Sequence, residues 1–236
     1  MINMKDGIMN NHFYSFDLGP VHFISYSTEF YYFVEYGWTQ IAVQYDWLKN
    51  DLAEATKPEN RAKRPWIIVM GHRPMYCSSD HIGGCTMKDN IVRKGIPILK
   101  SFGLEDLFYS YGVDLEIFGH EHNYERLFPI YDYKVFNGSV DNPYKNPDAP
   151  IHLITGSAGN HELITPFKNI QPQWSAFRIP DYGYTRMHVV NSTHIDIEQI
   201  SDKDGTVVDK FTIQKDTHGP YSESERIKML LENTVY

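Results

Sequence analysis

The chain has 236 residues, of which 42% are hydrophobic, 14% aromatic and 22% charged, a composition typical of a globular protein. Its 22 Lys and Arg against 30 Asp and Glu give a formal net charge of −8, so nucleic acid is not an expected partner. No apolar run approaches the ~20 residues of a membrane span. The N-terminal residues also lack the basic and apolar segments of a secretory signal peptide.

The first elements that the sequence predicts are two strands, residues 13–18 and 21–26, joined by a Gly-Pro turn. Apolar residues at helical spacing from position 41 to 52 predict a helix, and the apolar run at 66–70 predicts a strand buried on both faces. A helical stretch at about 90–111, broken near Gly103, precedes a strand at 113–118. Because strands and helices alternate, we expect right-handed parallel crossovers.

After about residue 150 the pattern changes to short alternating segments separated by Gly, Asn and Asp turns. These segments predict an antiparallel set of strands that forms a second sheet on the first. A surface loop is expected before them, and a helix close to the C-terminus after them. The strands are expected at 151–154, 184–190, 194–199 and 207–213, the loop at 132–150 and the helix at 223–233.

Two of the predicted buried strands are followed by the same dipeptide, Gly-His. The first gives His72, and the second gives His120, with His122 two residues further on. Ligands of open α/β sheets bind beyond the carboxyl ends of the strands, and residues two apart in an extended chain point to the same side. Since imidazole is a common transition-metal ligand, the pattern favours a metal site over three unrelated histidines.

These histidines lie in two octapeptides, VMGHRPMY at 69–76 and GHEHNYER at 119–126. Both closely resemble the last two metal-ligand motifs of purple acid phosphatases, which belong to the metallophosphoesterase superfamily. The strand pair at 16–25 and the run from Gly156 to His194 also resemble this family, so the similarity covers nearly the whole chain. It implies an α/β fold, a four-layer α/β/β/α metallophosphoesterase sandwich that is truncated at the N-terminus.

The resemblance also implies a domain organisation and a reaction. Residues 1–149 would be the C-terminal part of the catalytic domain, residues 150–221 the C-terminal region that completes the sandwich, and residues 222–236 a tail. The implied enzyme is an acid phosphatase that hydrolyses phosphate monoesters at a binuclear centre of Fe(III) and a divalent ion, Zn, Fe or Mn.

The family motifs assign a role to four histidines. His72 and His120 are expected to bind the divalent ion, and His122 the ferric ion. His81 lies in the loop where family members carry a substrate-facing histidine, and it is therefore the candidate catalytic residue. The match at this position is loose, and a solvated loop histidine is the alternative.

The family's earlier motifs, Asp-x-Gly, Gly-Asp-x-x-Tyr and Gly-Asn-His-Glu, are expected before the region that this sequence matches. They supply an Asp that bridges both metals, a Tyr and an Asn. Asp6-Gly7 is not an Asp-x-Gly, and no Gly-Asp-x-x-Tyr occurs in the sequence. Residues 159–162 spell Gly-Asn-His-Glu but follow His122, so we interpret them as a coincidence, or at most as a contact behind the ligands.

Two other functions therefore stay open. One is an inactive secreted glycoprotein fragment with an incomplete metal site. The other is a mononuclear zinc hydrolase that uses the three histidines and keeps an open water position. Apart from a phosphate monoester, the partner that we consider is a second copy of the chain.

Two cysteines and two sequons indicate a compartment. Cys77 and Cys85 flank a short loop with glycines, and this spacing fits a local disulfide better than two free thiols. Asn137 and Asn191 each begin an Asn-x-Ser/Thr glycosylation sequon. With the family resemblance, these features favour a secreted or lysosomal protein, although the chain as given carries no signal peptide.

Overall fold

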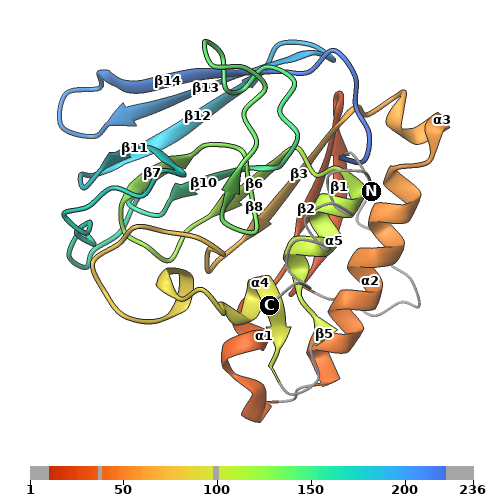
Figure 1. Ribbon diagram of the computed structural model, residues 1–236, viewed down its shortest axis with the longest axis horizontal. Helices are drawn as coiled ribbons and strands as arrows, with labels where there is room; N and C mark the ends of the chain where they lie inside the picture. The colour runs from red at the N-terminus through yellow and green to blue at the C-terminus, as the bar shows by residue number, and fades with distance from the viewer. Residues whose placement is uncertain (1–10, 37–38, 98–100, 222–236) are drawn as a thin grey trace.

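The computed structural model describes residues 11–36, 39–97 and 101–221, and its centre is a mixed sheet of seven strands (Figure 1). These strands are β1 (Tyr14–Leu18), β2 (Val21–Ser25), β3 (Trp66–Gly71), β6 (Leu115–Phe118), β7 (Tyr124–Leu127), β10 (Ile151–Thr155) and β11 (Ser175–Ile179). Their order across the sheet is β1-β2-β3-β6-β10-β7-β11. Strands β2, β3, β6 and β10 pair in parallel, whereas β1, β7 and β11 pair antiparallel.

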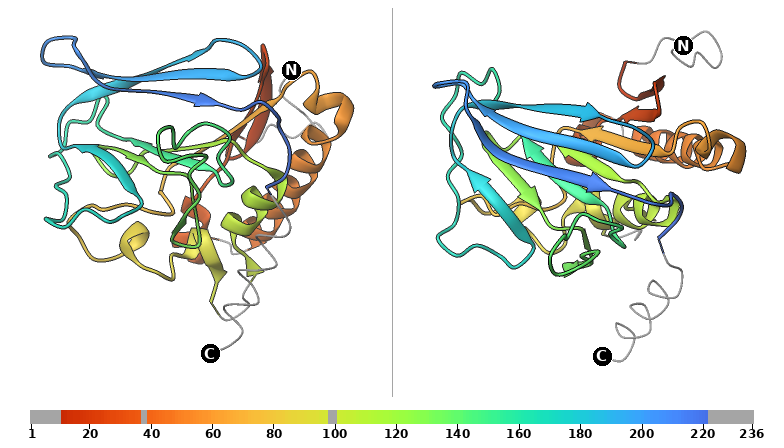
Figure 2. Two further views of the ribbon diagram at one scale, coloured as in Figure 1. Left: turned by 45° about the horizontal axis from the view of Figure 1, so that its top comes forward. Right: turned by 90° about the horizontal axis from the view of Figure 1, so that it is seen from above.

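Helices cover one face of this sheet and a smaller antiparallel sheet covers the other, as Figure 2 shows. Together they form an α/β/β arrangement, which agrees with the predicted α/β class; the described residues form three of the four predicted layers. The helices are α1 (Glu29–Tyr32), α2 (Thr39–Ala55), α3 (Pro58–Arg61), α4 (Ile91–Lys94) and α5 (Leu104–Tyr111), with short 3-10 helices η1 (Val34–Tyr36) and η2 (Gly84–Thr86). The smaller sheet contains β12 (Gly183–Val189), β13 (His194–Ser201) and β14 (Val207–Gln214). The remaining strands form two short antiparallel pairs. One pair is β4 (Gly95–Ile96) with β5 (Ser101–Phe102), and the other is β8 (Ile130–Tyr131) with β9 (Lys134–Val135).

Strand β3 explains why the sheet has a core on each side. Ile67 and Val69 pack among helix residues in one apolar cluster, while Trp66 and Ile68 pack with the smaller sheet in the other. All four side chains are fully buried, as their continuous apolar run predicts. Alternation along the strand therefore places one pair of side chains in each core.

The predicted helix at 90–111 is wrong in its middle. The chain forms α4, then the short pair β4–β5, and then α5. Gly95 has a φ of 81°, and a Cβ at this position would collide with the carbonyl of Ser101. Because Pro97 follows two residues later and cannot donate a helical hydrogen bond, the helix ends at Lys94.

Strand β10 also differs from the expectation, because it belongs to the central sheet and not to the second one. It pairs in parallel with β6 and antiparallel with β7. Its side chains from Ile151 to Ile154 are almost completely buried, which fits a strand covered on both faces. Strands β7 and β11 were not expected from the sequence. The segment at 132–150, expected to be a surface loop, includes strand β9 and the buried side chain of Tyr144. The expected helix at 223–233 lies outside the described residues.

Candidate metal centre

The two Gly-His dipeptides meet at one edge of the central sheet. Strands β3 and β6 pair in parallel, and their register places Gly71 opposite Phe118. His72 and His120 follow at this edge, and the amide of Gly119 donates to the carbonyl of His72 at 3.0 Å. A Cβ on Gly71 would come within 2.8 Å of a tyrosine ring, so only glycine fits at this point without a shift.

The rings of His72 and His120 are placed as two ligands of one ion would be. Nε2 of His72 lies 3.3 Å from Nδ1 of His120, and the ring planes meet at 76°. A tetrahedral zinc ion with Zn–N distances of about 2.0–2.1 Å separates two nitrogen ligands by about 3.3 Å. His120 has a φ of 61°, a left-handed conformation that is uncommon outside glycine and is found at functional sites. The pair therefore fits a divalent ion.

Arg73 lies beside this pair. Its Nη1 is 3.1 Å from Nε2 of His120, its Nε donates to Glu29 at 2.7 Å, and its guanidinium lies over the ring of Tyr32. Burial, with the charges of Arg73 and His72, lowers the pKa of His120 to about 4, so the ring is neutral above that pH. Because a guanidinium only donates, Nε2 accepts from Arg73 in this arrangement and the proton lies on Nδ1. Arg73 would therefore have to leave Nε2 before Nδ1 could bind a metal ion.

His122 lies in a neighbouring cleft of about 700 Å³, which His81 and His120 also line. Its amide donates to Oγ1 of Thr165 at 2.9 Å, and its carbonyl accepts from the amide of Thr165 at 3.1 Å. Its Nδ1 lies 3.6 Å from a carboxylate oxygen of Glu162. The backbone of His122 is thus fixed on both sides, while its ring faces the cleft.

The three predicted ligands do not converge on a single point. Within the part of the chain that the structure describes, the ring nitrogens of His72, His120 and His122 are not all within 4.8 Å of one another. In this arrangement the three rings cannot all be ligands of one zinc ion.

The loop that carries His81 forms a wall of the cleft. The predicted disulfide between Cys77 and Cys85 is present, and the backbone of the loop donates to the carbonyl of Pro166 at 2.7 Å. Nε2 of His81 lies 3.5 Å from a carboxylate oxygen of Glu121, which is buried. His81 is therefore held at the cleft rather than free in solvent, although its catalytic role stays a prediction.

Comparisons with known proteins decide the family. A calcineurin-like phosphoesterase model matches residues 5–124, and an iron/zinc purple acid phosphatase-like protein C model matches residues 149–210. The chain belongs to the purple acid phosphatases, within the calcineurin-like phosphoesterases. Its fold is accordingly a mixed α/β metallophosphoesterase fold with a large central sheet.

Several relatives are acid phosphatases by name. Acid phosphatase type 7 of Mus musculus is 59% identical over 83% of this chain and 44% of its own length, and that of Homo sapiens is 55% identical over 87% and 47%. The chain thus spans about half the length of these relatives. A purple acid phosphatase from yellow lupin (Lupinus luteus) seeds is similar in structure, with a TM-score of 0.67 and 28% identity over 86% of this chain and 33% of its own.

Two segments spell purple acid phosphatase motifs without forming them. The Gly-Asn-His-Glu at 159–162 follows β10, and Oδ1 of Asn160 accepts from the amide of Glu162 at 2.6 Å, so it closes a turn. Only the Glu162 side chain approaches His122, as a contact behind the predicted ligand. Asp17-Leu18-Gly19 also spells Asp-x-Gly, but the carboxylate of Asp17 contacts His22 and Arg64.

Sequence reasoning missed residues that position the predicted ligands. Arg73 follows His72 directly, so a closer reading of the family motif could have included it. Thr165 is 43 residues from His122, and no local pattern signals their contact.

Asn137 and Asn191, the sequon residues, are both exposed, and Oδ1 of Asn191 accepts from the amide and hydroxyl of Thr193 in a turn. Their glycosylation stays a prediction.

Proposed function

We propose that this chain takes part in the hydrolysis of phosphate monoesters at a binuclear metal centre. The observation that carries the proposal is the 3.3 Å separation between Nε2 of His72 and Nδ1 of His120, at the adjoining ends of two parallel strands. This spacing suits two ligands of one ion. Membership of the purple acid phosphatases supports the reaction class.

Each residue has a role under this proposal. His72 and His120 would hold the divalent ion, Zn, Fe or Mn, and His122 would face the ferric ion. When bound, the two ions supply Lewis acidity toward the phosphate group. Thr165 fixes the backbone of His122, and His81, held by the disulfide loop, would donate a hydrogen bond to the leaving oxygen.

The predicted ferric position of the binuclear centre has fewer ligands than the divalent position. His122 is the one described residue that the family motifs assign to the ferric ion, and Glu162 lies 3.6 Å from its Nδ1. A ferric ion with so few ligands is poorly compensated for its lost hydration. We therefore propose that a polypeptide of these 236 residues holds a divalent ion but shows little turnover. An inactive protein is the second candidate, favoured by a 32% identical Arabidopsis thaliana relative described as a probable inactive purple acid phosphatase.

Zinc binding measured by calorimetry tests the divalent site. The wild-type chain is compared with His72→Ala and His120→Ala, and the matched control is His188→Ala, which removes an exposed histidine of β12. We expect the control to bind like wild type and the two site variants to bind at least tenfold more weakly. Unchanged affinity in His72→Ala would contradict the assignment.

Hydrolysis of an aryl phosphate near pH 5, with iron and zinc supplied, tests the ferric half. We expect little turnover. Turnover comparable with that of a full-length relative, abolished by His122→Ala, would show that further ligands complete the centre.

We also propose a secreted or lysosomal location, supported by the disulfide and the two exposed sequons. In the described part of the chain, no helix combines the length and apolar character needed to cross a membrane. The domain division at residue 149 stays a proposal, as does a homo-oligomer.

A further inference from the structure

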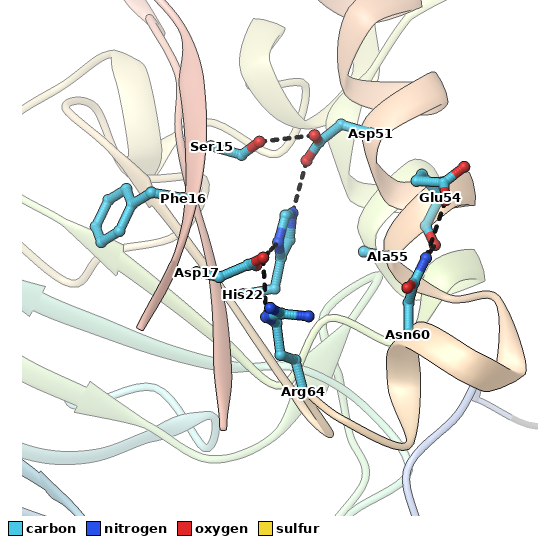
Figure 3. A pocket seen from close by; sticks show the side chains of 9 residues that line it. All are labelled: Ser15, Phe16, Asp17, His22, Asp51, Glu54, Ala55, Asn60 and Arg64. Atoms are coloured by element: carbon cyan, nitrogen blue, oxygen red, sulfur yellow. Dashed lines mark hydrogen bonds and ion pairs between the residues drawn. The ribbon is translucent and has the colours of Figure 1, made fainter. Parts of the chain in front are cut away.

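A second group of ionisable residues lies away from the metal centre, between the β1–β2 hairpin and helix α2 (Figure 3). It borders a cavity of about 260 Å³. His22, at its centre, pairs in register with Ile67 near the start of β3, whereas His72 follows the end of that strand. The group is therefore at the opposite end of β3 from the predicted ligands.

The His22 ring bridges the hairpin and the helix. Its Nδ1 lies 2.7 Å from Oδ1 of Asp17, which is directly opposite His22 on β1. Its Nε2 lies 2.8 Å from Oδ2 of Asp51 on α2. The side chains of His22 and Asp51 are only 14% and 8% exposed. Both ring nitrogens thus contact carboxylates; the contact with Asp51 is largely buried, whereas the side chain of Asp17 is 39% exposed.

This geometry determines the charge of the ring. An ionised carboxylate only accepts hydrogen bonds, and a neutral imidazole has one donor and one acceptor nitrogen. Both contacts of His22 can therefore be hydrogen bonds only when both nitrogens carry a proton. In the neutral ring, one nitrogen lone pair would face a carboxylate, and that contact would be repulsive.

We propose that His22, held as an imidazolium between Asp17 and Asp51, clamps the β1–β2 hairpin to helix α2 at acid pH and releases it when the ring loses its proton.

The other groups around His22 balance this charge. Arg64 contacts the second oxygen of Asp17 at 2.8 Å, and the hydroxyl of Ser15 donates to Asp51 at 2.7 Å. Glu54 of α2 also lines the cavity, but Lys57 and Asn60 bond to it, and the β3 neighbour, Ile67, is apolar. With His22 protonated, the carboxylates of Asp17 and Asp51 are balanced by two cations, His22 and Arg64. After deprotonation, Asp17 keeps Arg64, whereas Asp51 loses the cation that it contacts.

The direction of the pH effect follows from this balance. Burial lowers the pKa of His22, but hydrogen bonds and charges from Asp51 and Asp17 outweigh it and raise the pKa above its ordinary value. The clamp therefore contributes fully below the ordinary pKa of about 6.5, and its contribution is lost as the pH rises through the folded pKa. Since β1 is an edge strand of the described sheet and pairs there with β2 alone, release would weaken its protection against hydrogen exchange.

Hydrogen exchange followed by mass spectrometry tests the clamp in the full chain. Exchange rates, corrected for their intrinsic pH dependence, are compared between hairpin peptides and the β12–β14 sheet at pH 5 and pH 8. We expect hairpin protection to fall about tenfold for each pH unit by which the folded pKa is raised, within that interval. Protection of β12–β14 should not change.

Two variants and a control make the result specific. Asp51→Asn and His22→Gln should abolish the pH dependence of hairpin protection, whereas His161→Gln, the same change at an exposed histidine, should preserve it. NMR titration of the His22 ring should place its pKa above that of His161 in wild type, with a drop in Asp51→Asn. A His22 ring that titrates no higher than His161, or hairpin protection that does not respond to pH, would overturn the proposal. These measurements do not depend on the metal centre.

Discussion

The two ends of strand β6 carry opposite kinds of polar chemistry. At its start, Asp114 is completely buried, bonds to Lys215 at 2.6 Å and Arg61 at 3.2 Å, and accepts from the amide of Ile67 at 2.8 Å. Burial acts to raise the pKa of Asp114, but the two cations outweigh it and hold the pKa well below its usual range. At its end, His120 is half-buried and has a left-handed backbone.

The difference shows how one strand separates stability from chemistry. The Asp114 end ties α3, β3 and the segment after β14 together through two buried ion pairs and a hydrogen bond. The His120 end keeps neutral ring nitrogens at a surface cleft, where a ligand can reach them. We therefore expect substitutions at the first end to change the free energy of unfolding, and those at the second to change metal binding.

The largest effect is expected from Asp114→Ala. Removing this carboxylate leaves Arg61 and Lys215 buried without a counter-charge, so the free energy of unfolding should fall by about 3–5 kcal/mol. Urea unfolding measures it, and Asp89→Ala, at an exposed site, is the control. A loss below about 1 kcal/mol would mean that this end of β6 is not an anchor. If Asp114→Ala does not fold, Asp114→Asn provides the milder measurement.

Replacing both Cys77 and Cys85 by Ser should lower the free energy of unfolding by about 2.5 kcal/mol, because the unfolded chain loses a closed loop. Urea unfolding with and without a reductant measures this, and the reductant should affect wild type but not the variant. Zinc affinity should stay within about threefold of wild type, since the disulfide holds His81 and not His72. A larger loss of affinity would show that the loop also supports the divalent site.

The middle of β6 gives a pH test. His152 of β10 lies opposite Glu116 in register, and burial lowers the pKa of His152 to about 3. Because its folded pKa is below the ordinary value near 6.5, its contribution to stability is complete above pH 6.5 and declines as the pH falls. The expected loss is about 2 kcal/mol between pH 6.5 and pH 5, a range in which Asp114 stays ionised.

Urea unfolding across this range compares wild type with His152→Leu. The variant should show a smaller decline toward acid, and since His22 is present in both chains, its opposite contribution cancels in the comparison. Parallel pH dependences in the two chains would contradict the assignment of His152 as a buried neutral ring.

The smallest effect on stability is expected from His120→Gly. Glycine tolerates a φ of 61° without steric cost, so the free energy of unfolding should change by no more than about 1 kcal/mol. Zinc affinity should nevertheless fall at least tenfold. Comparison with His120→Ala, which keeps a Cβ, separates backbone strain from the lost ligand. If His120→Gly kept its zinc affinity, this end of β6 would not be a metal site.

Much of the fold could be predicted because its signals are local. A continuous apolar run marks β3 as a buried strand, the segment at 113–118 marks β6, and helical spacing marks α2. The Gly-His dipeptides and the Cys77–Cys85 spacing are likewise readable within a few residues. The middle of the 90–111 segment was mispredicted because Gly95 and Pro97 override a helical pattern in their neighbours.

By itself, the sequence determined the family, the two Gly-His motifs and the disulfide loop. Only the tertiary structure decided that β10 inserts between β6 and β7, that Thr165 fixes His122, and that His22 joins Asp17 to Asp51. Periodicity records which side of an element is apolar, but not which distant element covers it. Contacts between residues far apart in the sequence depend on how whole strands and helices pack and pair. No local sequence pattern indicates which of these pairings forms.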